Sequence, residues 1–415
     1  MPTRRLPVYE LQVGMYVAKL DLSWFRSPFL RHAFLIEEPT QIERLVRAGV
    51  HTVEIDPERS IAVNPTDEFP EYHSDIVRKS EQVPALLPKH IKPLAQLNEE
   101  HAQALLAKKQ LDEAVHSLYT TITETGTVRP DQATEAVQEI TIVARTLPNS
   151  ALFMALSQHR GGDSSLSQHA LATCTLALML GQTCHLNPLE LQELATAALL
   201  HDIGLLQIPP RLISRAFVTS PPLSELERRK FRAHPRLSVD ALERQGGFDA
   251  SILHLVGHHH PAYTVDSTQG PSPSRSLLDR TGILVLVDKY DELLTGFGGA
   301  SPYGPQQAIQ RLYIDARQGE LNQNILAQFI ATVGIYPVHS HVKLNTNETA
   351  VVTGLNAEKL HQPIVTITHD TEGRERQEPL VVDLAHQEDQ NHPRAIALVL
   401  DDQPVPEAAR ISRAA

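Results

Sequence analysis

Apolar side chains recur every three to four positions over most of the chain, a spacing typical of amphipathic α-helices. The spacing is regular from Lys92 to Thr125, and Gly126 and Pro130 then interrupt it. A second helix is expected over 131–146, and residues 151–337 are expected to be mostly helical. The pattern therefore predicts that helices form the main body of the protein.

Two segments within 151–337 have informative patterns. Ser224 and Glu227 have the spacing of a capping box, which predicts a helix that begins there and continues to Gln245. The run from Ile283 to Val287 fits a buried strand as well as one face of a helix. We expect a helix here because the neighbouring segments are helical.

Shorter stretches with strand character lie near both ends of the chain. Near the N-terminus they are Val8 to Leu20, Ala33 to Ile36 and Val50 to Ile55, with a short helix expected after Pro39. Near the C-terminus they are Val342 to Leu344, Ala350 to Thr353, Ile364 to Ile367 and Ala395 to Leu400. Four parts are expected: an N-terminal α+β domain at 1–65, a linker and helical connector at 66–150, a helical domain at 151–337, and a β-rich extension with a tail at 338–415.

Charge and composition narrow the function classes. The 37 Lys and Arg residues against 49 Asp and Glu residues give a net charge of −12, which argues against a nucleic-acid polymer as partner. The two cysteines, Cys174 and Cys184, cannot form a disulfide framework, which fits a reducing compartment. No stretch has the length and apolar purity of a membrane span or a signal peptide, so a cytoplasmic protein is expected.

Histidine is the most unusual residue of the chain, with 21 copies. The sharpest signal is the adjacent pair His201 and Asp202 at the end of an apolar helix. Adjacent helical residues point ~100° apart, so the pair can share a metal ion only where other ligands complete the site. Further candidate ligands are His169, His234, His258, His259 and Asp288. Imidazole and carboxylate donors suit transition metals such as Mn, Fe and Zn, and this number of donors fits two ions.

The order and spacing of these residues resemble the HD-GYP domain, a helical variant of the HD superfamily that hydrolyses cyclic di-GMP. The resemblance covers 166–337 and rests on six short motifs. They are Leu-Ser-Gln-His at 166–169, Ala-Leu-Leu-His-Asp-Ile-Gly at 198–204, Ala-His-Pro at 233–235, Gly-His-His at 257–259, Leu-Val-Asp-Lys-Tyr-Asp at 286–291 and Val-Gly-Ile-Tyr-Pro at 333–337. Residues 6–60 also resemble the N-terminal domain of unknown function that is often fused to HD-GYP domains.

The resemblance implies a mainly α, HD-superfamily helical bundle that holds two divalent metal ions, Fe, Mn or another transition metal. It assigns the metals to His169, His201, Asp202, His234, His258, His259 and Asp288. The His-Asp pair at 201–202 is implied as the catalytic pair. Some family members bind a third metal through a Glu at the position that Ser165 occupies here, so two metals are expected.

Other positions follow or depart from the family pattern. Tyr303 is expected to contact the substrate, and Asp291 and His260 are expected to lie beside the metal ligands. Leu205 stands where the family has a lysine that meets the phosphate, the Gly-Tyr-Pro signature is absent, and Gly304 replaces an arginine. Each lost cation is expected to cost roughly 1.5–3 kcal/mol of phosphate binding.

Two functions agree with this pattern. The first is a metal-dependent phosphodiesterase that opens cyclic di-GMP to pGpG, or further to GMP, with activity reduced by the lost cations. The alternative is a catalytically degenerate domain that binds cyclic di-GMP or a signalling protein. We favour the enzyme because the ligand set is complete. Protein partners in signalling and a homodimer through the apolar stripe of 92–146 are further expectations.

Overall fold

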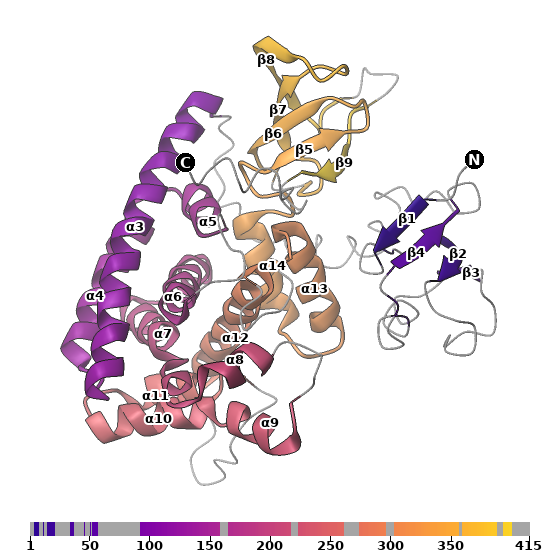
Figure 1. Cartoon of the computed structure of the whole chain (residues 1–415). Helices are drawn as coiled ribbons and strands as arrows, with labels where there is room; N and C mark the ends of the chain where they lie inside the picture. The colour runs from indigo at the N-terminus through magenta and orange to yellow at the C-terminus, as the bar shows by residue number, and fades with distance from the viewer. Residues whose placement is uncertain are drawn as a thin grey trace, which may run out of the picture. The chain divides into compact units, whose positions relative to one another are not determined.

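The protein is represented by a computed structural model of the 415-residue chain (Figure 1). The described residues are 92–157, 165–216, 223–260, 274–295, 303–356, 359–387 and 393–400, together with 4–7, 11, 15–20, 34–36, 45, 50 and 52–56. The chain divides into two compact units, Met1–Asp75 and Ile76–Ala415. The expected linker before Lys92 and the expected tail lie outside the described residues, and the four domain boundaries stay predictions.

The N-terminal unit contains an antiparallel sheet with the strand order β1-β4-β2-β3. The strands are β1 (Arg4–Pro7), β2 (Tyr16–Leu20), β3 (Phe34–Leu35) and β4 (Thr52–Ile55). Val17 and Val53 are buried in a small core with Leu45. Of the strand expected from Val8 to Leu20, Tyr16–Leu20 is confirmed as β2, and nearly all of the first half lies outside the described residues. The short helix expected between β3 and β4 lies, apart from Leu45, outside the described residues.

The described part of the second unit begins with three helices, α3 (Leu94–Thr125), α4 (Pro130–Thr146) and α5 (Asn149–Ser157). Gly126 follows α3 with φ +67, a left-handed conformation that glycine adopts without strain. Helix α3 packs against α4, α5 and α6 (Leu166–Thr183). The two helices expected from the apolar period over this region are confirmed.

Helices α6 and α7 (Pro188–Leu200) lie at the centre of the helical region (Figure 1). Capping boxes begin both: Ser165 accepts a hydrogen bond from the Gln168 N–H, and Asn187 accepts one from the Glu190 N–H. The two helices pack against each other and against α12 (Arg275–Thr295). Because these contacts cover α6 on most sides, His169 in its first turn is fully buried.

A short 3-10 helix, η3 (Ile203–Gln207), and four helices continue the chain: α8 (Pro210–Ala216), α9 (Glu225–Arg232), α10 (His234–Gln245) and α11 (Ala250–Gly257). The single helix predicted from Ser224 to Gln245 is wrong, because the chain divides it into α9 and α10. Pro235 lacks the N–H that would continue the hydrogen bonds of α9, so the chain breaks there. This break places His234 at the start of α10.

Three further helices complete the bundle, namely α12, α13 (Pro305–Arg317) and α14 (Gln323–Val333). The segment 283–287, which fitted both a strand and a helix, is helical and buried within α12. This confirms the mainly α fold class. Among the described helices, none combines the length and the apolar character that a membrane span requires.

The C-terminal region forms an antiparallel sheet with the strand order β8-β7-β6-β5-β9. The strands are β5 (His341–Leu344), β6 (Thr349–Gly354), β7 (Ile364–His369), β8 (Glu375–Asp383) and β9 (Ile396–Val399). Strand β8 was not expected: it is a largely exposed edge strand containing Pro379, so it lacks apolar alternation. Before β5, the buried His339 has φ +78, and its ring lies edge-on to His101 of α3 with 5.1 Å between centroids.

Candidate metal centre

Six of the seven residues predicted as metal ligands lie together between the helices. They are His169 in the first turn of α6, His201 and Asp202 after α7, His234 at the start of α10, His259 after α11 and Asp288 in α12. None of them is more than 3% exposed to solvent. These residues are therefore distant in the sequence, from His169 to Asp288, and the packing of α6, α7 and α12 brings them close together.

Main-chain carbonyls orient three of the four imidazoles in the same way. In each, the ring Nδ1 donates a hydrogen bond to the carbonyl oxygen three residues earlier. The pairs are His201 with Ala198 at 2.8 Å, His234 with Phe231 at 2.8 Å and His259 with Val256 at 2.6 Å. A carbonyl can only accept, so Nδ1 carries the proton and Nε2 of the neutral ring has a free lone pair. Metal-binding histidines are commonly held in this way.

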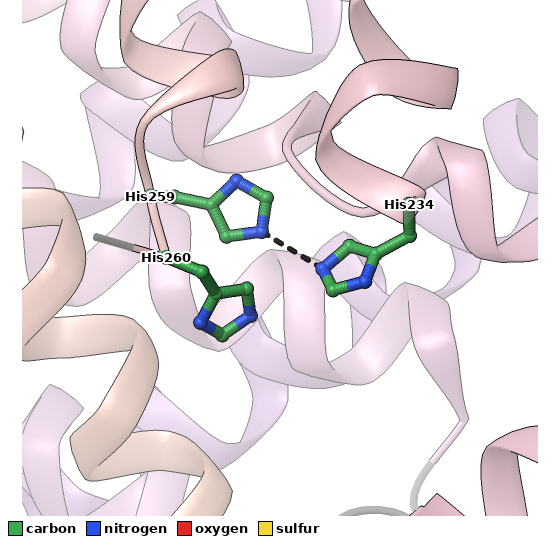
Figure 2. A group of neighbouring side chains, drawn as sticks. All are labelled: His234, His259 and His260. Carbon is green, nitrogen blue, oxygen red and sulfur yellow. Dashed lines mark hydrogen bonds between the residues drawn. The ribbon is translucent and has the colours of Figure 1, made fainter. Parts of the chain in front are cut away.

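The Nε2 atoms then face one another in two couples. His169 Nε2 lies 3.2 Å from His201 Nε2, and His234 Nε2 lies 3.1 Å from His259 Nε2 (Figure 2). Two lone pairs at this distance repel unless a proton or a metal ion lies between them. Each couple therefore has the donor chemistry of a cation site.

Asp202 lies between the two couples. Its Oδ1 is 3.2 Å from His234 Nε2 and 3.3 Å from His259 Nε2. Its Oδ2 is 3.6 Å from His201 Nε2 and 3.8 Å from His169 Nε2. One carboxylate thus offers an oxygen to each couple, as a ligand shared by two neighbouring cations does.

Asp288 faces the first couple from α12. Its Oδ1 lies 3.1 Å from His169 Nε2 and 3.3 Å from His201 Nε2. The Oδ1 atoms of both Asp202 and Asp288 are buried and accept no hydrogen bond. Buried carboxylate oxygens without a donor are costly, and a coordinated cation removes that cost. The residues present therefore fit a divalent metal.

The buried carboxylates of this cavity are stable in their charged form only when positive charge lies close to them. Burial acts to raise the pKa of Asp202, but His201 and His234 outweigh it and hold that pKa well below its ordinary value. Burial likewise opposes protonation of His169, yet Asp288 and Asp291 raise the pKa of this imidazole well above its ordinary value. A proton or a metal ion can supply the charge, and at Nε2 the two compete.

His260 and Glu292, which were not predicted as metal ligands, also belong to the cluster. His260 Nε2 lies 3.9 Å from Asp288 Oδ2, and the His260 ring lies beside those of His234 and His259 (Figure 2). The ligand atoms of His260, Asp288 and Glu292 lie within 4.8 Å of one another. Glu292 follows Asp288 by four residues, a spacing that puts both on one helical face and is visible in the sequence.

Burial is the main influence on both of these added residues. It lowers the pKa of the His260 imidazole to about 3, with a further contribution from His259. Burial and the neighbouring carboxylate of Asp288 raise the pKa of Glu292 well above its ordinary value. Both shifts have the sign expected when a group with few counter-charges leaves water.

His258 is not brought into the cluster. Its ring stacks on that of His254 with 4.0 Å between centroids, and its Nδ1 lies 2.8 Å from the His254 carbonyl oxygen. The helix end at Gly257 turns the following residues so that His259 and His260, rather than His258 and His259, face the other ligands. The doublet that meets the cluster thus lies one residue later than expected.

Asp291 and Tyr303, which were expected near the metal ligands or the substrate, differ in burial and in the group that each contacts. Asp291 Oδ2 accepts a hydrogen bond from His169 Nδ1 at 2.8 Å and is fully buried. The Tyr303 side chain is exposed, and its backbone N–H donates to the Leu293 carbonyl oxygen at 2.8 Å, close to the end of α12. Asp291 thus fixes one ligand ring, whereas Tyr303 is tied to the helix that carries Asp288.

Leu205 explains one departure from the family pattern. Its side chain is buried in an apolar cluster. The other members of this cluster are Ile208, Leu212, Leu223 and Phe231. Apolar packing has therefore taken the place of a phosphate-binding cation at this position.

Comparisons with known proteins agree with this architecture. A family model described as HD domain matches residues 162–325, and one described as Domain of unknown function (DUF3391) matches residues 3–133. This chain carries an HD domain. All the cluster residues lie within the HD domain, and the DUF3391 domain precedes it.

Two relatives, one matching most of the chain and one matching about half of it, are both named as cyclic di-GMP phosphodiesterases. The cyclic di-GMP phosphodiesterase PA4108 of Pseudomonas aeruginosa is 26% identical over 387 residues, which are 92% of this chain and 89% of the relative. The cyclic di-GMP phosphodiesterase PdeB of Borreliella burgdorferi is 23% identical over 199 residues, 48% of this chain and 50% of the relative. A solved structure, Bd1817, a HDG"Y"P protein from Bdellovibrio bacteriovorus, covers 79% of this chain and is itself covered to 98%, with 15% identity and a TM-score of 0.43.

Proposed function

We propose that this protein is a metal-dependent phosphodiesterase that hydrolyses cyclic di-GMP in bacterial second-messenger signalling, to pGpG or further to GMP. The observation that supports this most strongly is the two facing imidazole couples with Asp202 between them. Two relatives named cyclic di-GMP phosphodiesterase support the choice of substrate. A cytoplasmic location and a homodimer through 92–146 belong to the same proposal, and light scattering tests the dimer.

Two divalent cations, Mn or Fe, have neighbouring positions in this proposal. One ion would be held by His169, His201 and Asp288 and the other by His234, His259 and His260, while Asp202 would be available to both. His260 here has the role that the sequence analysis gave to His258. Two such ions supply an activated water molecule and neutralise charge that develops on the phosphodiester oxygens.

The chain's own residues prepare the site for this chemistry. The carbonyl anchors and Asp291 keep the Nε2 atoms directed inward, which lowers the cost of ordering the ligands. Burial excludes water and strengthens each charge interaction in the cavity. Tyr303, whose side chain is exposed beside the end of α12, is proposed to contact the substrate.

The packing of Leu205 favours a second candidate. Because this side chain is buried in an apolar cluster, the position supplies no cation to a phosphate. In the alternative, the HD domain keeps its metals but binds cyclic di-GMP, or a signalling protein, without turnover.

One experiment separates the two functions. The full-length protein is loaded with Mn²⁺, or with Fe²⁺ under anaerobic conditions, and incubated with cyclic di-GMP while pGpG and GMP are followed by chromatography. We expect hydrolysis by the wild type and a loss of at least about 100-fold in Asp202→Ala, together with loss of bound metal. Asp240→Ala, a half-buried carboxylate of α10 that pairs with Arg236, is the matched control and should retain both.

The outcome decides between the proposals. Metal-loaded protein that binds cyclic di-GMP but releases no product under either metal rejects the enzyme and favours the binding module. Equal metal content in wild type and Asp202→Ala rejects the ligand assignment itself.

A further inference from the structure

Two side chains hold the end of α7, where His201 and Asp202 follow the helix. Carbonyl groups in the last turn of an α-helix have no N–H partner within the helix. The carbonyl oxygen of Ala198 accepts a hydrogen bond from His201 Nδ1 at 2.8 Å. The next carbonyl oxygen, that of Leu199, accepts one from the Tyr119 hydroxyl at 2.7 Å. Both bonds are buried, so side chains rather than bulk water satisfy the end of this helix.

Tyr119 reaches α7 from α3, 80 positions earlier in the chain. Its side chain is only 4% exposed, and Val115 and Ile122, one turn before and one turn after it, are also buried. These residues share one face of α3 because three or four positions make one helical turn. Helix α3 packs against α6 along its length. The position of the Tyr119 hydroxyl is therefore set by the packing of a long helix.

The hydroxyl of Tyr119 is held as a hydrogen-bond donor. A carbonyl oxygen only accepts, so the phenol must keep its proton for this bond to exist. Burial raises the pKa of Tyr119 well above its ordinary value, and the nearby Asp202 and Cys174 raise it further. Without this donor, the Leu199 carbonyl would be buried and unpaired, which is unfavourable enough to move the turn towards another partner.

A movement of this turn reaches the metal centre directly. Only His201 and Leu200 separate Leu199 from Asp202 along the chain. Asp202 Oδ1 lies 3.2 Å from His234 Nε2, and His201 Nε2 lies 3.3 Å from Asp288 Oδ1. Both contacts depend on where the end of α7 lies, so the Tyr119 bond bears on the distances between the candidate ligands.

Tyr119 lies outside the part of the chain that carries these ligands. The DUF3391 model matches residues 3–133 and therefore includes most or all of α3, whereas the HD model matches residues 162–325. The side chain that holds the end of α7 thus comes from the segment matched by the domain of unknown function.

We propose that Tyr119 is a positioning residue of the metal centre, through which α3 of the DUF3391-matched segment fixes the turn that carries His201 and Asp202. It acts through the Leu199 carbonyl rather than by contact with metal or substrate. The inference deepens the proposed function and rests on it in taking the cluster as a metal site.

Tyr119→Phe tests the inference, because it keeps the ring and removes only the hydroxyl. In the full-length protein, titration calorimetry should show about 10-fold weaker Mn²⁺ binding than in the wild type. At saturating Mn²⁺, kcat for cyclic di-GMP should fall while KM stays unchanged, because the lost bond does not involve the substrate. The matched control is Thr366→Val, which removes a buried hydroxyl that donates to Thr353 Oγ1 at 3.1 Å in the C-terminal sheet.

Thermal unfolding separates positioning from packing. In a chelator, both variants should melt below the wild type, because each loses a buried hydrogen bond. In Mn²⁺, Thr366→Val should gain as much in melting temperature as the wild type, and Tyr119→Phe should gain less because it binds the ion more weakly. Equal gains in all three proteins would overturn the inference, and so would an equal loss of Mn²⁺ affinity in the control.

The results distinguish a failure of this inference from a failure of the proposed function. Hydrolysis of cyclic di-GMP by the wild type, with the same Mn²⁺ affinity and kcat in Tyr119→Phe, rejects the positioning role and leaves the enzyme in place. Weaker Mn²⁺ binding in Tyr119→Phe but not in Thr366→Val, without hydrolysis by any of the three proteins, rejects the enzyme and supports the positioning role.

Discussion

Gly204→Ala tests directly how the fold aligns the metal centre. Gly204 lies in η3, two residues after Asp202, and its N–H donates a hydrogen bond to Ser238 Oγ of α10 at 2.8 Å. An added Cβ would lie 2.2 Å from the carbonyl oxygen of His234 and 2.7 Å from the backbone nitrogen of Ser238. Both are main-chain atoms, so no side-chain rotation relieves the overlap.

Relief requires η3 and α10 to move apart. An ordinary contact begins at 3.4 Å, so the His234 carbonyl oxygen must withdraw by about 1.2 Å. Overpacking of this kind costs about 1–3 kcal/mol of stability. The same movement separates Asp202 from His234, whose Oδ1 and Nε2 atoms are 3.2 Å apart. A misplacement of about 1 Å costs roughly 100-fold in activity, and we expect a loss of that order in Mn²⁺ affinity and hydrolysis.

Titration calorimetry measures Mn²⁺ binding, and thermal unfolding in a chelator measures stability. Gly126→Ala is the control: its Cβ meets nothing within 4 Å, but its φ of +67 still imposes about 1 kcal/mol of strain. The control should lose stability and keep its Mn²⁺ affinity. A folded Gly204→Ala protein that binds Mn²⁺ as tightly as the wild type would refute the reasoning, because the overlap would then have been relieved without moving the ligands.

Three other substitutions give distinct outcomes. Leu205→Lys should destabilise the protein by several kcal/mol, visible as a lower melting temperature, because it places an ammonium group in an apolar cluster; unchanged stability would mean that the lysine reaches water. His260→Ala should weaken Mn²⁺ binding at least about 10-fold while His258→Ala leaves it unchanged, and the reverse order in calorimetry would contradict the assignment. Burial lowers the pKa of His339 to about 4, so the folded state binds fewer protons than the unfolded state between that pKa and about 6.5. Stability should therefore fall as the pH drops from 7 to 5, and His339→Asn, which tolerates a positive φ, should fall less; parallel melting curves for both proteins would rule this out.

The main features of the fold were predictable because they depend on local patterns. The apolar period over α3 and α4, and the helical surroundings of 283–287, indicated the helices that the structure contains. The division at Pro235 is not evident from the sequence, because the capping box at Ser224 and the glycine at 246 mark only the two outer ends of the helical segment. Strand β8 was missed because an exposed edge strand has no buried face to impose alternation.

The candidate site was predictable in residue type and order but not in detail. Which two of His258, His259 and His260 turn inward depends on where α11 ends, a difference of one residue that the sequence does not determine. Glu292 was not predicted because a carboxylate one turn after Asp288 is usually solvent-exposed on a helix, whereas the folded chain leaves it half-buried beside Asp288.

The carbonyl anchors of His201, His234 and His259 have a consequence for how this domain can diverge. The acceptor in each case is a peptide group, which every amino acid provides, so mutation at the anchoring positions cannot delete it. Substitutions in the surrounding sequence can then change the residues that line the nucleotide site without changing the orientation of the imidazole rings. A centre built in this way depends on the course of the backbone rather than on the identity of the anchoring side chains.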